Sequence, residues 1–376
     1  MFSLDAKQEE RAQRVLRESV VIDSLGGYDE PTEEYKRYAD QLLATGMHYA
    51  DLYEELNKFE ADHPNELGLA WQEGFRNSGM NALSLTMGPF GKEMFTYEAA
   101  IKDLAIWTHK FDTIPELIKV VKADDILRAK RENRFGIILN FQNTTHFGAS
   151  LDKLDLFYRL GIRQIQMTYN DLNLVGSGCT ERVDCGLSRY GLKVVERMNQ
   201  LGILIDVSHS GYRTSLDTIE ASDAPVAFTH TVCKAVYNHD RGKTDDQLEA
   251  IAKRNGYVGI VLVPNFITAE ADAGVEHFLD HVDHAVKVVG VDKVGIGTDY
   301  DEPYEPIGQR MNEEIIASLG FEPKHAIDFN RKTQGYHNWR DYITLTRGLI
   351  TRGYNDEEIK GILGGNFFRI FKEVVG

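Results

Sequence analysis

The stretch ILIDVSHSGYRTSLDTIEASDAPVAFTHTVCKAVYNHDR, from Ile203 to Arg241, decides the fold of this chain. Its two apolar runs, residues 203–207 and 226–228, each lead into a hydroxyl residue followed by a histidine, His209 or His230. A helix-sized segment separates the runs, so the pattern predicts strand, helix, strand. The carboxyl ends of parallel strands meet at one mouth, and the two histidines are therefore predicted to share one metal ion or one substrate. The alternative is that each histidine only caps its strand through hydrogen bonds.

The same alternation of apolar strands and amphipathic helices runs through most of the chain. Eight strands are predicted, namely Val20–Leu25, Asn81–Gly88, Phe135–Gln142, Ile162–Tyr169, Ile203–His209, Pro225–His230, Tyr257–Pro264 and Lys293–Asp299. No G-x-G-x-x-G motif follows the first strand and no P-loop is present, which disfavours nucleotide-binding folds. We therefore predict an α/β protein, a single (β/α)₈ TIM barrel over residues 1–376, rather than an open doubly wound sheet.

One charged and aromatic segment, residues 28–67, interrupts this alternation after the first strand. The spacing of its tyrosines and leucines predicts two short helices. Because it follows a strand, the insertion is expected near the barrel mouth, where it either covers the mouth or makes a subunit contact. Extra helices are predicted at the C-terminus, from about residue 341 to residue 375.

Composition limits the partners. The 376 residues carry a formal net charge of −16, which argues against nucleic-acid binding because that needs a basic surface. No apolar run is long enough to span a membrane, the N-terminal segment lacks the apolar core of a signal peptide, and three cysteines give no even disulfide framework. We expect a cytoplasmic homo-oligomer that acts on a small molecule, with no nucleic-acid or membrane partner.

An acidic residue completes the predicted site. The motif GIGTDYDE places Asp299 at the end of the eighth strand, across the mouth from His209 and His230. Two histidines and one carboxylate suit a divalent ion that keeps positions open for water and substrate. Such an ion can supply hydroxide for amide hydrolysis, although the same ligand set is compatible with iron and oxygen chemistry.

Other charged or histidine side chains could contribute. Arg241 follows the second histidine, and a guanidinium can hold a substrate carboxylate through two parallel hydrogen bonds. His146, in the loop QNTTHFG after the third strand, could also reach the mouth. His277, His281 and His284 recur at helical spacing on an outer helix, where we expect surface or packing roles.

The motifs DVSHSG, APVAFTH with the NHDRG turn, GVDKVGIGTDYD and EEIKGILGGNFFRIF resemble the renal or membrane dipeptidase family of zinc peptidases. The resemblance extends in order from about residue 20 to residue 371 and leaves out the insertion. It implies a (β/α)₈ barrel, two bridged zinc ions and cleavage of dipeptides. It also implies that His209 and His230 bind the second zinc, that Asp299 binds the first, and that Arg241 holds the substrate carboxylate.

The chain departs from that family pattern at four positions. Leu25 and Gly27 stand where the family has the His-x-Asp ligands of the first zinc, and neither can bind a metal. Gln142 stands at the bridging glutamate, and Tyr169 at the histidine that steadies the reaction intermediate. Two close dications need anionic ligands between them, so we expect at most one ion, zinc, at the two histidines and Asp299.

Neutral hydrogen-bonding groups thus replace charged ones at the mouth. We assign catalytic roles to Asp299, Tyr169 and Gln142, the last two by polarising a carbonyl, and substrate-binding roles to Asn143 and Asn170 beside Arg241 and His146. The main hypothesis is a hydrolase of a small peptide-like or amide substrate with a free carboxylate. Two alternatives are a lyase or isomerase that acts on a small carboxylate, and a non-catalytic protein that binds a small molecule.

Overall fold

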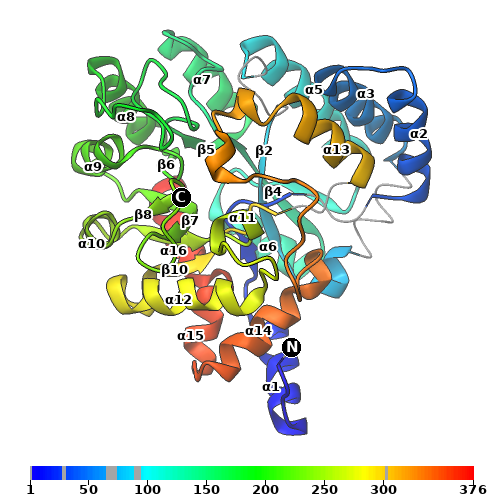
Figure 1. The fold of residues 1–376 in the computed structure, drawn as a ribbon, viewed down its shortest axis with the longest axis vertical. Coiled ribbons are helices and arrows are strands. Elements are labelled where there is room, and N and C mark those ends of the chain that lie inside the picture. Colours follow the sequence, from blue (N-terminus) through cyan, green and yellow to red (C-terminus); the bar gives the residue numbers. More distant parts are fainter. Residues whose placement is uncertain (1, 28–30, 65–73, 89–94, 301–303) are drawn as a thin grey trace.

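Eight parallel strands form the centre of the molecule, in the order β1-β2-β4-β5-β6-β7-β9-β10 (Figure 1). The computed structural model describes residues 2–27, 31–64, 74–88, 95–300 and 304–376. The barrel strands are β1 (Ile22–Asp23), β2 (Ala82–Thr86), β4 (Phe135–Phe141), β5 (Ile162–Gln166), β6 (Leu204–Asp206), β7 (Ala227–Cys233), β9 (Tyr257–Ile260) and β10 (Val294–Ile296). Two short strands flank them, β3 (Leu117–Lys119) beside β4 and β8 (Gly242–Lys243) beside β7.

The barrel closes between its first and last strands. The backbone N–H of Ser24 donates to the carbonyl of Ile296 at 3.0 Å, and that of Asp299 donates to the carbonyl of Leu25 at 2.8 Å. All eight predicted strands are present, and the predicted (β/α)₈ barrel is confirmed. The strands read as nearly continuous apolar runs because helices cover their outer faces while side chains fill the interior.

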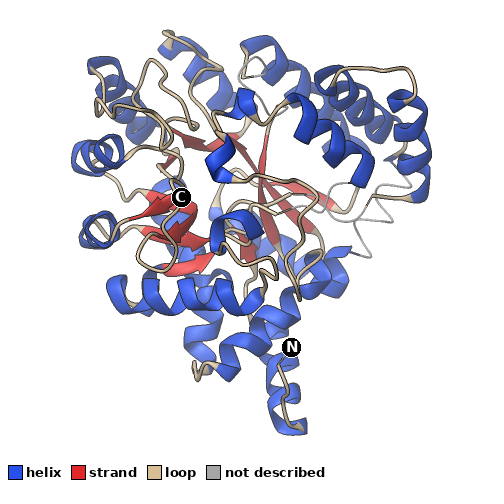
Figure 2. Ribbon diagram, in the orientation of Figure 1, coloured by secondary structure: helices blue, strands red, loops and turns tan. Residues whose placement is uncertain are grey.

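Helices surround the strands on the outside (Figure 2). They are α1 (Ala6–Glu18), α2 (Glu33–Leu43), α3 (Tyr49–Asp62), α5 (Tyr97–Thr113), α6 (Ala123–Glu132), α7 (Leu151–Leu160), α8 (Arg189–Leu201), α9 (Tyr212–Ala221), α10 (Asp245–Lys253), α11 (Pro264–Ile267), α12 (Val275–Val289), α13 (Glu305–Glu314), α14 (Tyr342–Thr351), α15 (Asp356–Lys360) and α16 (Asn366–Val375). Helix α15 lies within the predicted C-terminal helical segment, and its start is capped by the Asn355 side chain, which accepts the backbone N–H groups of Glu357 and Glu358.

Two glycines let the barrel interior narrow beneath the site. A Cβ added at Gly259 in β9 would lie 2.0 Å from the carbonyl oxygen of Thr229, and one at Gly297 would lie 1.9 Å from the same atom. Both distances are far inside van der Waals contact. These glycines therefore let the ends of β9 and β10 approach the backbone of β7 directly beside His230.

The two helices predicted within the insertion are α2 and α3, while residues 28–30 and 65–67 at its ends lie outside the described part of the chain. Both helices contact α13, which Figure 1 shows crossing in front of the strands. Leu52 and Leu56 of α3 share a buried apolar cluster with Met311 of α13. The insertion thus forms one wall over the barrel mouth.

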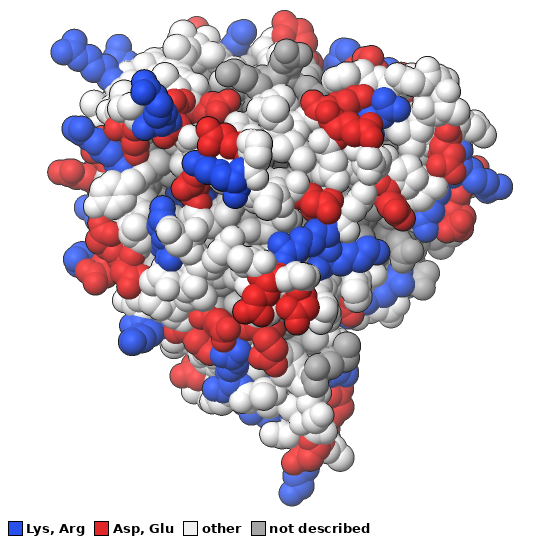
Figure 3. Space-filling model, viewed as in Figure 1, with Lys and Arg blue, Asp and Glu red and all other residues white. Residues whose placement is uncertain are grey.

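The surface carries charges of both signs. On the face shown in Figure 3, acidic and basic side chains are interspersed over the described residues. None of the described helices combines the length and the apolar character that crossing a bilayer requires.

Candidate metal centre and active site

His209 and His230 meet at the barrel mouth, as their strand positions predict. His209 follows β6 and His230 lies within β7, and both rings are fully buried. Their Nε2 atoms are 2.9 Å apart. The ligand atoms of these two histidines and of Asp299 all lie within 4.8 Å of one another, which makes them a candidate set of metal ligands.

Hydrogen bonds on the far side of each ring fix which nitrogen carries the proton. The Nδ1 of His209 lies 2.7 Å from Oδ1 of Asn170, which can only accept, so this nitrogen donates. The Nδ1 of His230 lies 2.8 Å from Oγ1 of Thr229, whose own hydroxyl proton goes to Asp206 at 2.5 Å. Both Nε2 atoms are therefore left with lone pairs that face each other, an arrangement that a shared cation satisfies.

Electrostatics keeps both rings neutral. Burial is the largest cause that lowers the pKa of His209 and of His230 well below the usual value, and the nearby guanidinium of Arg241 adds to it. A neutral imidazole is the form that binds a metal ion. The donor set of two imidazoles and one carboxylate fits one divalent ion, zinc included.

Asp206, at the end of β6, is the centre of the polar network behind His230. Its carboxylate accepts the hydroxyls of Ser208 and Thr229, each at 2.5 Å, and also the backbone N–H groups of both residues. Through Thr229 it orients the imidazole of His230, in the manner of a carboxylate behind a metal-bound histidine. Burial raises the pKa of Asp206, and its four hydrogen bonds oppose that rise.

Asp299 reaches the mouth from an unusual backbone conformation. Its φ is +49°, in the left-handed region that few residues other than glycine adopt. The hydrogen bond from its N–H to Leu25 holds that conformation at the point where the barrel closes. Its Oδ2 lies 4.0 Å from Nε2 of His230. Residues in such conformations gather at functional sites, where the surrounding structure holds them.

On the opposite side of the mouth, the described positions that match the family's first-zinc and bridging ligands carry no anionic side chain. Leu25, Gly27 and Gln142 line the pocket where the family pattern has its first-zinc and bridging residues. Nε2 of Gln142 donates to the hydroxyl of Thr86 at 2.9 Å, while its buried Oε1 has no hydrogen-bond partner among the described residues. Oε1 of this side chain is thus placed to accept a hydrogen bond from a ligand, whereas Nε2 is not available to donate to a carbonyl.

Tyr169 lies against the first histidine. Its ring stacks on that of His209 with centroids 4.2 Å apart and an interplanar angle of 20°. Burial is the main cause that raises its pKa, and the carboxylate of Asp299 raises it further. The phenol therefore keeps its proton and can donate a hydrogen bond to a substrate oxygen.

Arg241 is buried behind the histidines and does not line the pocket. Its Nη1 donates to the carbonyl of Ser208 at 2.6 Å and its Nη2 to the carbonyl of His230 at 3.2 Å. Lys243 donates in the same way to the carbonyl of Ser210 at 2.6 Å, and burial lowers its pKa to about 7. These two side chains tie together the segments that carry the two candidate ligand histidines.

The remaining predicted substrate contacts lie outside the pocket lining as well. Oδ1 of Asn143 accepts from the backbone of its own loop and from Asn173, and Asn170 holds His209. His146 is buried against Phe141, with ring centroids 4.3 Å apart, and burial lowers its pKa to about 4. On the outer helix, His281 bonds the backbone of Cys233 at 3.0 Å, a packing role as expected.

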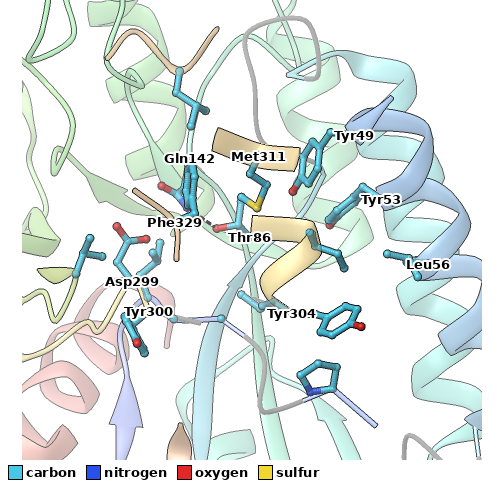
Figure 4. Close-up of a pocket in the computed structure, with 18 of the residues that line it drawn as sticks. Tyr49, Tyr53, Leu56, Thr86, Gln142, Asp299, Tyr300, Tyr304, Met311 and Phe329 are labelled. Atoms are coloured by element: carbon cyan, nitrogen blue, oxygen red, sulfur yellow. Dashed lines mark hydrogen bonds between the residues drawn. The ribbon is translucent and has the colours of Figure 1, made fainter. Parts of the chain in front are cut away.

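A cavity of about 260 Å³ lies over the mouth (Figure 4). Its polar end contains Thr86, Gln142, His209 and Asp299, and Figure 4 shows Tyr49 and Tyr53 of α3 projecting into it from the other side. This volume is somewhat below the roughly 300–1,000 Å³ typical of drug-sized ligands, so a small ligand fits.

Sequence reasoning missed several of these residues. Asp206 could have been identified from the sequence, because a single carboxylate within an apolar strand, three residues before a histidine, is unusual. Lys243 lies two residues after Arg241, in a segment that looks like an ordinary polar loop. The lining from α3 gave no signal, because which face of that helix meets the cavity depends on packing against α13.

Comparison with known proteins finds a family and a fold that match this chain. A sequence model of the family described as membrane dipeptidase (peptidase family M19) matches residues 9–309 and 326–375. Dipeptidase tcpJ of Claviceps purpurea is 27% identical over 256 residues, which are 67% of this chain and 54% of that protein. The chain spans about half the length of the curated relatives that it matches.

Two solved structures share the fold. An amidohydrolase from Pseudomonas aeruginosa has a TM-score of 0.76 and 25% identity, covering 96% of this chain and 98% of that one. A metallo peptidase from Rhodobacter sphaeroides, liganded with a phosphinate mimic of the dipeptide L-Ala-D-Ala, has a TM-score of 0.69 and 19% identity, covering 95% and 100%. At that lower identity the likeness concerns the fold alone.

Proposed function

The chain belongs to the membrane dipeptidase family, and on that premise we propose that it is a hydrolase of a small peptide-like or amide substrate with a free carboxylate. We further propose that it uses at most one divalent ion, zinc, held by His209, His230 and Asp299. The observation that carries the proposal is the pair of facing Nε2 lone pairs beside a carboxylate, at the polar end of a small cavity.

A bound ion would polarise the scissile carbonyl and lower the pKa of a coordinated water. The chain's own residues would position the reactants. Both Tyr169 and Gln142 line the cavity, where the hydroxyl of Tyr169 would donate to the carbonyl oxygen and Oε1 of Gln142 would accept an N–H of the substrate. Asn170 and the Asp206–Thr229 pair keep the two imidazoles oriented with their Nε2 lone pairs toward the cavity.

The substrate carboxylate needs a cationic partner. Arg241 does not line the cavity, and each of its Nη groups donates to a backbone carbonyl, so this residue supports the site from behind. Arg331, whose Nη2 donates to the backbone carbonyl of Glu270, is the one Lys or Arg side chain on the described lining of the cavity. We propose Arg331 as the carboxylate partner, and Arg331→Met should raise KM for dipeptides about tenfold or more while kcat changes little. An unchanged KM would reject this role.

Metal content and hydrolysis test the function together. We expect about one equivalent of zinc per chain, by mass spectrometry of the purified protein, and release of free amino acids from dipeptides. His209→Ala should lose both, whereas His109→Ala, an exposed histidine of α5, should lose neither. Turnover that survives complete metal removal, with no water incorporated into the product, would instead favour the lyase or isomerase alternative.

Two further expectations stay predictions from the sequence. A homo-oligomer would be detected as a multiple of the 42.6 kDa chain mass by light scattering. A cytoplasmic location would be tested by fractionating cells that express the protein.

A further inference from the structure

We propose that the substrate carries a large apolar group, aromatic or branched aliphatic, which occupies an apolar chamber between α3 and α13. The chamber is lined by Tyr49, Leu52, Tyr53, Leu56, Met311 and Phe329. The proposal deepens the hydrolase function proposed above and rests on it. It concerns which substrates that site selects.

Helix α3 supplies one wall through its sequence spacing. Tyr49, Leu52, Tyr53 and Leu56 recur every three or four residues and so share one face of the helix. Ile307 and Met311, four residues apart on α13, form the facing wall. The leucines and Met311 belong to the same apolar cluster, so packed side chains form both walls of the chamber.

The chamber joins the candidate catalytic end through Tyr169. This ring stacks on His209 and also packs against the apolar cluster that includes Leu52 and Leu56. Gln142, His209 and Asp299 line the same cavity. A group attached close to a scissile bond at the polar end can therefore extend into the chamber.

The lining beside α3 favours an apolar group over a carboxylate. The described acidic lining residues are Glu60, Asp299 and Asp328, and Glu60 on α3 is paired with Lys110 at 2.7 Å. A negatively charged substituent beside α3 would meet a carboxylate and apolar side chains. An apolar substituent instead gains the free energy of leaving water.

A dipeptide series tests the proposal. The series compares Ala-Ala with dipeptides in which Phe or Leu replaces the first or the second alanine. At the position that the chamber accepts, we expect kcat/KM to exceed that for Ala-Ala by about 30-fold. Leu56→Trp, which fills the chamber, should reduce that ratio to about threefold or less. Leu192→Trp, on α8 where the leucine is 50% exposed, should keep the wild-type ratio.

Met311→Phe fills the chamber from the opposite wall and guards against a misfolded Leu56→Trp variant. Equal kcat/KM values for the Phe and Ala dipeptides, or a ratio that neither filling variant changes, would overturn the proposal. If no dipeptide is hydrolysed, the proposed hydrolase function is wrong. Calorimetric binding of the same dipeptides then tests the chamber proposal separately. Tighter binding of the Phe dipeptide that is lost on filling supports the chamber, and no preference or no binding refutes it.

Discussion

The buried ion pair between Lys110 of α5 and Glu60 of α3 should anchor the insertion to the barrel. The ammonium lies 2.7 Å from the carboxylate, the Lys110 side chain is 0% exposed and that of Glu60 is 15% exposed. The ammonium also lies 4.7 Å from the centre of the Trp107 ring. Lys110→Met keeps the length of the side chain and removes its charge, which leaves the Glu60 carboxylate without this partner.

The expected cost follows from burial. Removing one member of a fully buried pair typically costs about 3–5 kcal/mol, because the other charge is left uncompensated. Glu60 keeps some contact with solvent, so we expect Lys110→Met to lower the free energy of unfolding by about 2–3 kcal/mol. Combining it with Glu60→Gln removes the stranded charge. The double variant should therefore be more stable than the sum of the two single effects by about 1–2 kcal/mol.

Urea unfolding measures these free energies. Circular dichroism and tryptophan fluorescence should give coincident transitions, and Trp107 makes the fluorescence sensitive to this region. Lys58→Met is a matched control, because Lys58 lies on the exposed side of α3 and forms its ion pairs within that helix. A cost below about 0.5 kcal/mol for Lys110→Met, or additive effects in the double variant, would refute the reasoning.

Three further predictions concern the barrel and the site. Burial raises the pKa of Asp103 to about 6, so the folded protein holds an extra proton between about pH 4 and 6 and loses stability as pH rises through that window. Relative to Asp103→Asn, the wild type should therefore lose about 2–3 kcal/mol of unfolding free energy from pH 4 to 7. If urea unfolding gives the same difference in free energy between the two proteins at pH 4 and at pH 7, this prediction is wrong. Asn170→Ala removes the acceptor for Nδ1 of His209 and should weaken zinc binding by about 10- to 100-fold in competition titrations, whereas Asn170→Asp keeps an acceptor and should retain it. Gly297→Ala places a methyl group against the carbonyl of Thr229 and should cost more than about 3 kcal/mol, so a thermal midpoint within 2 °C of the wild type would show that the strands can separate at little cost.

The barrel was predictable because its signals are local and repeated. Each strand reads as an apolar run, and parallel topology then brings the strand ends together whatever the loops do. For that reason the convergence of His209, His230 and Asp299 could be anticipated from position alone. The helices of the insertion were predictable from their spacing in the same way.

The direction of individual side chains was not predictable. Arg241 follows the second histidine, yet its guanidinium turns behind the site and bonds backbone carbonyls. Asn170 and His146 also follow strand ends, but both side chains bond to other parts of the protein. The amide of Asn170 bonds His209, and the ring of His146 bonds the carbonyl of Thr96. Whether a residue at a strand end faces the cavity or the core depends on loop conformation and on packing between distant segments, and neither leaves a pattern in the sequence.

The cavity is built from two parts of different origin. Its floor belongs to strand ends that the whole barrel holds in place, whereas its apolar wall comes from α3 and α13, which lie outside the strands. A change in that wall would alter what the cavity accepts without replacing the strand-end residues His209 and Asp299. Replacement of residues 49–56 and 307–311 alone can therefore change which substrates the cavity accepts. The two segments can be exchanged together to engineer a new substrate preference while the barrel sequence stays unchanged.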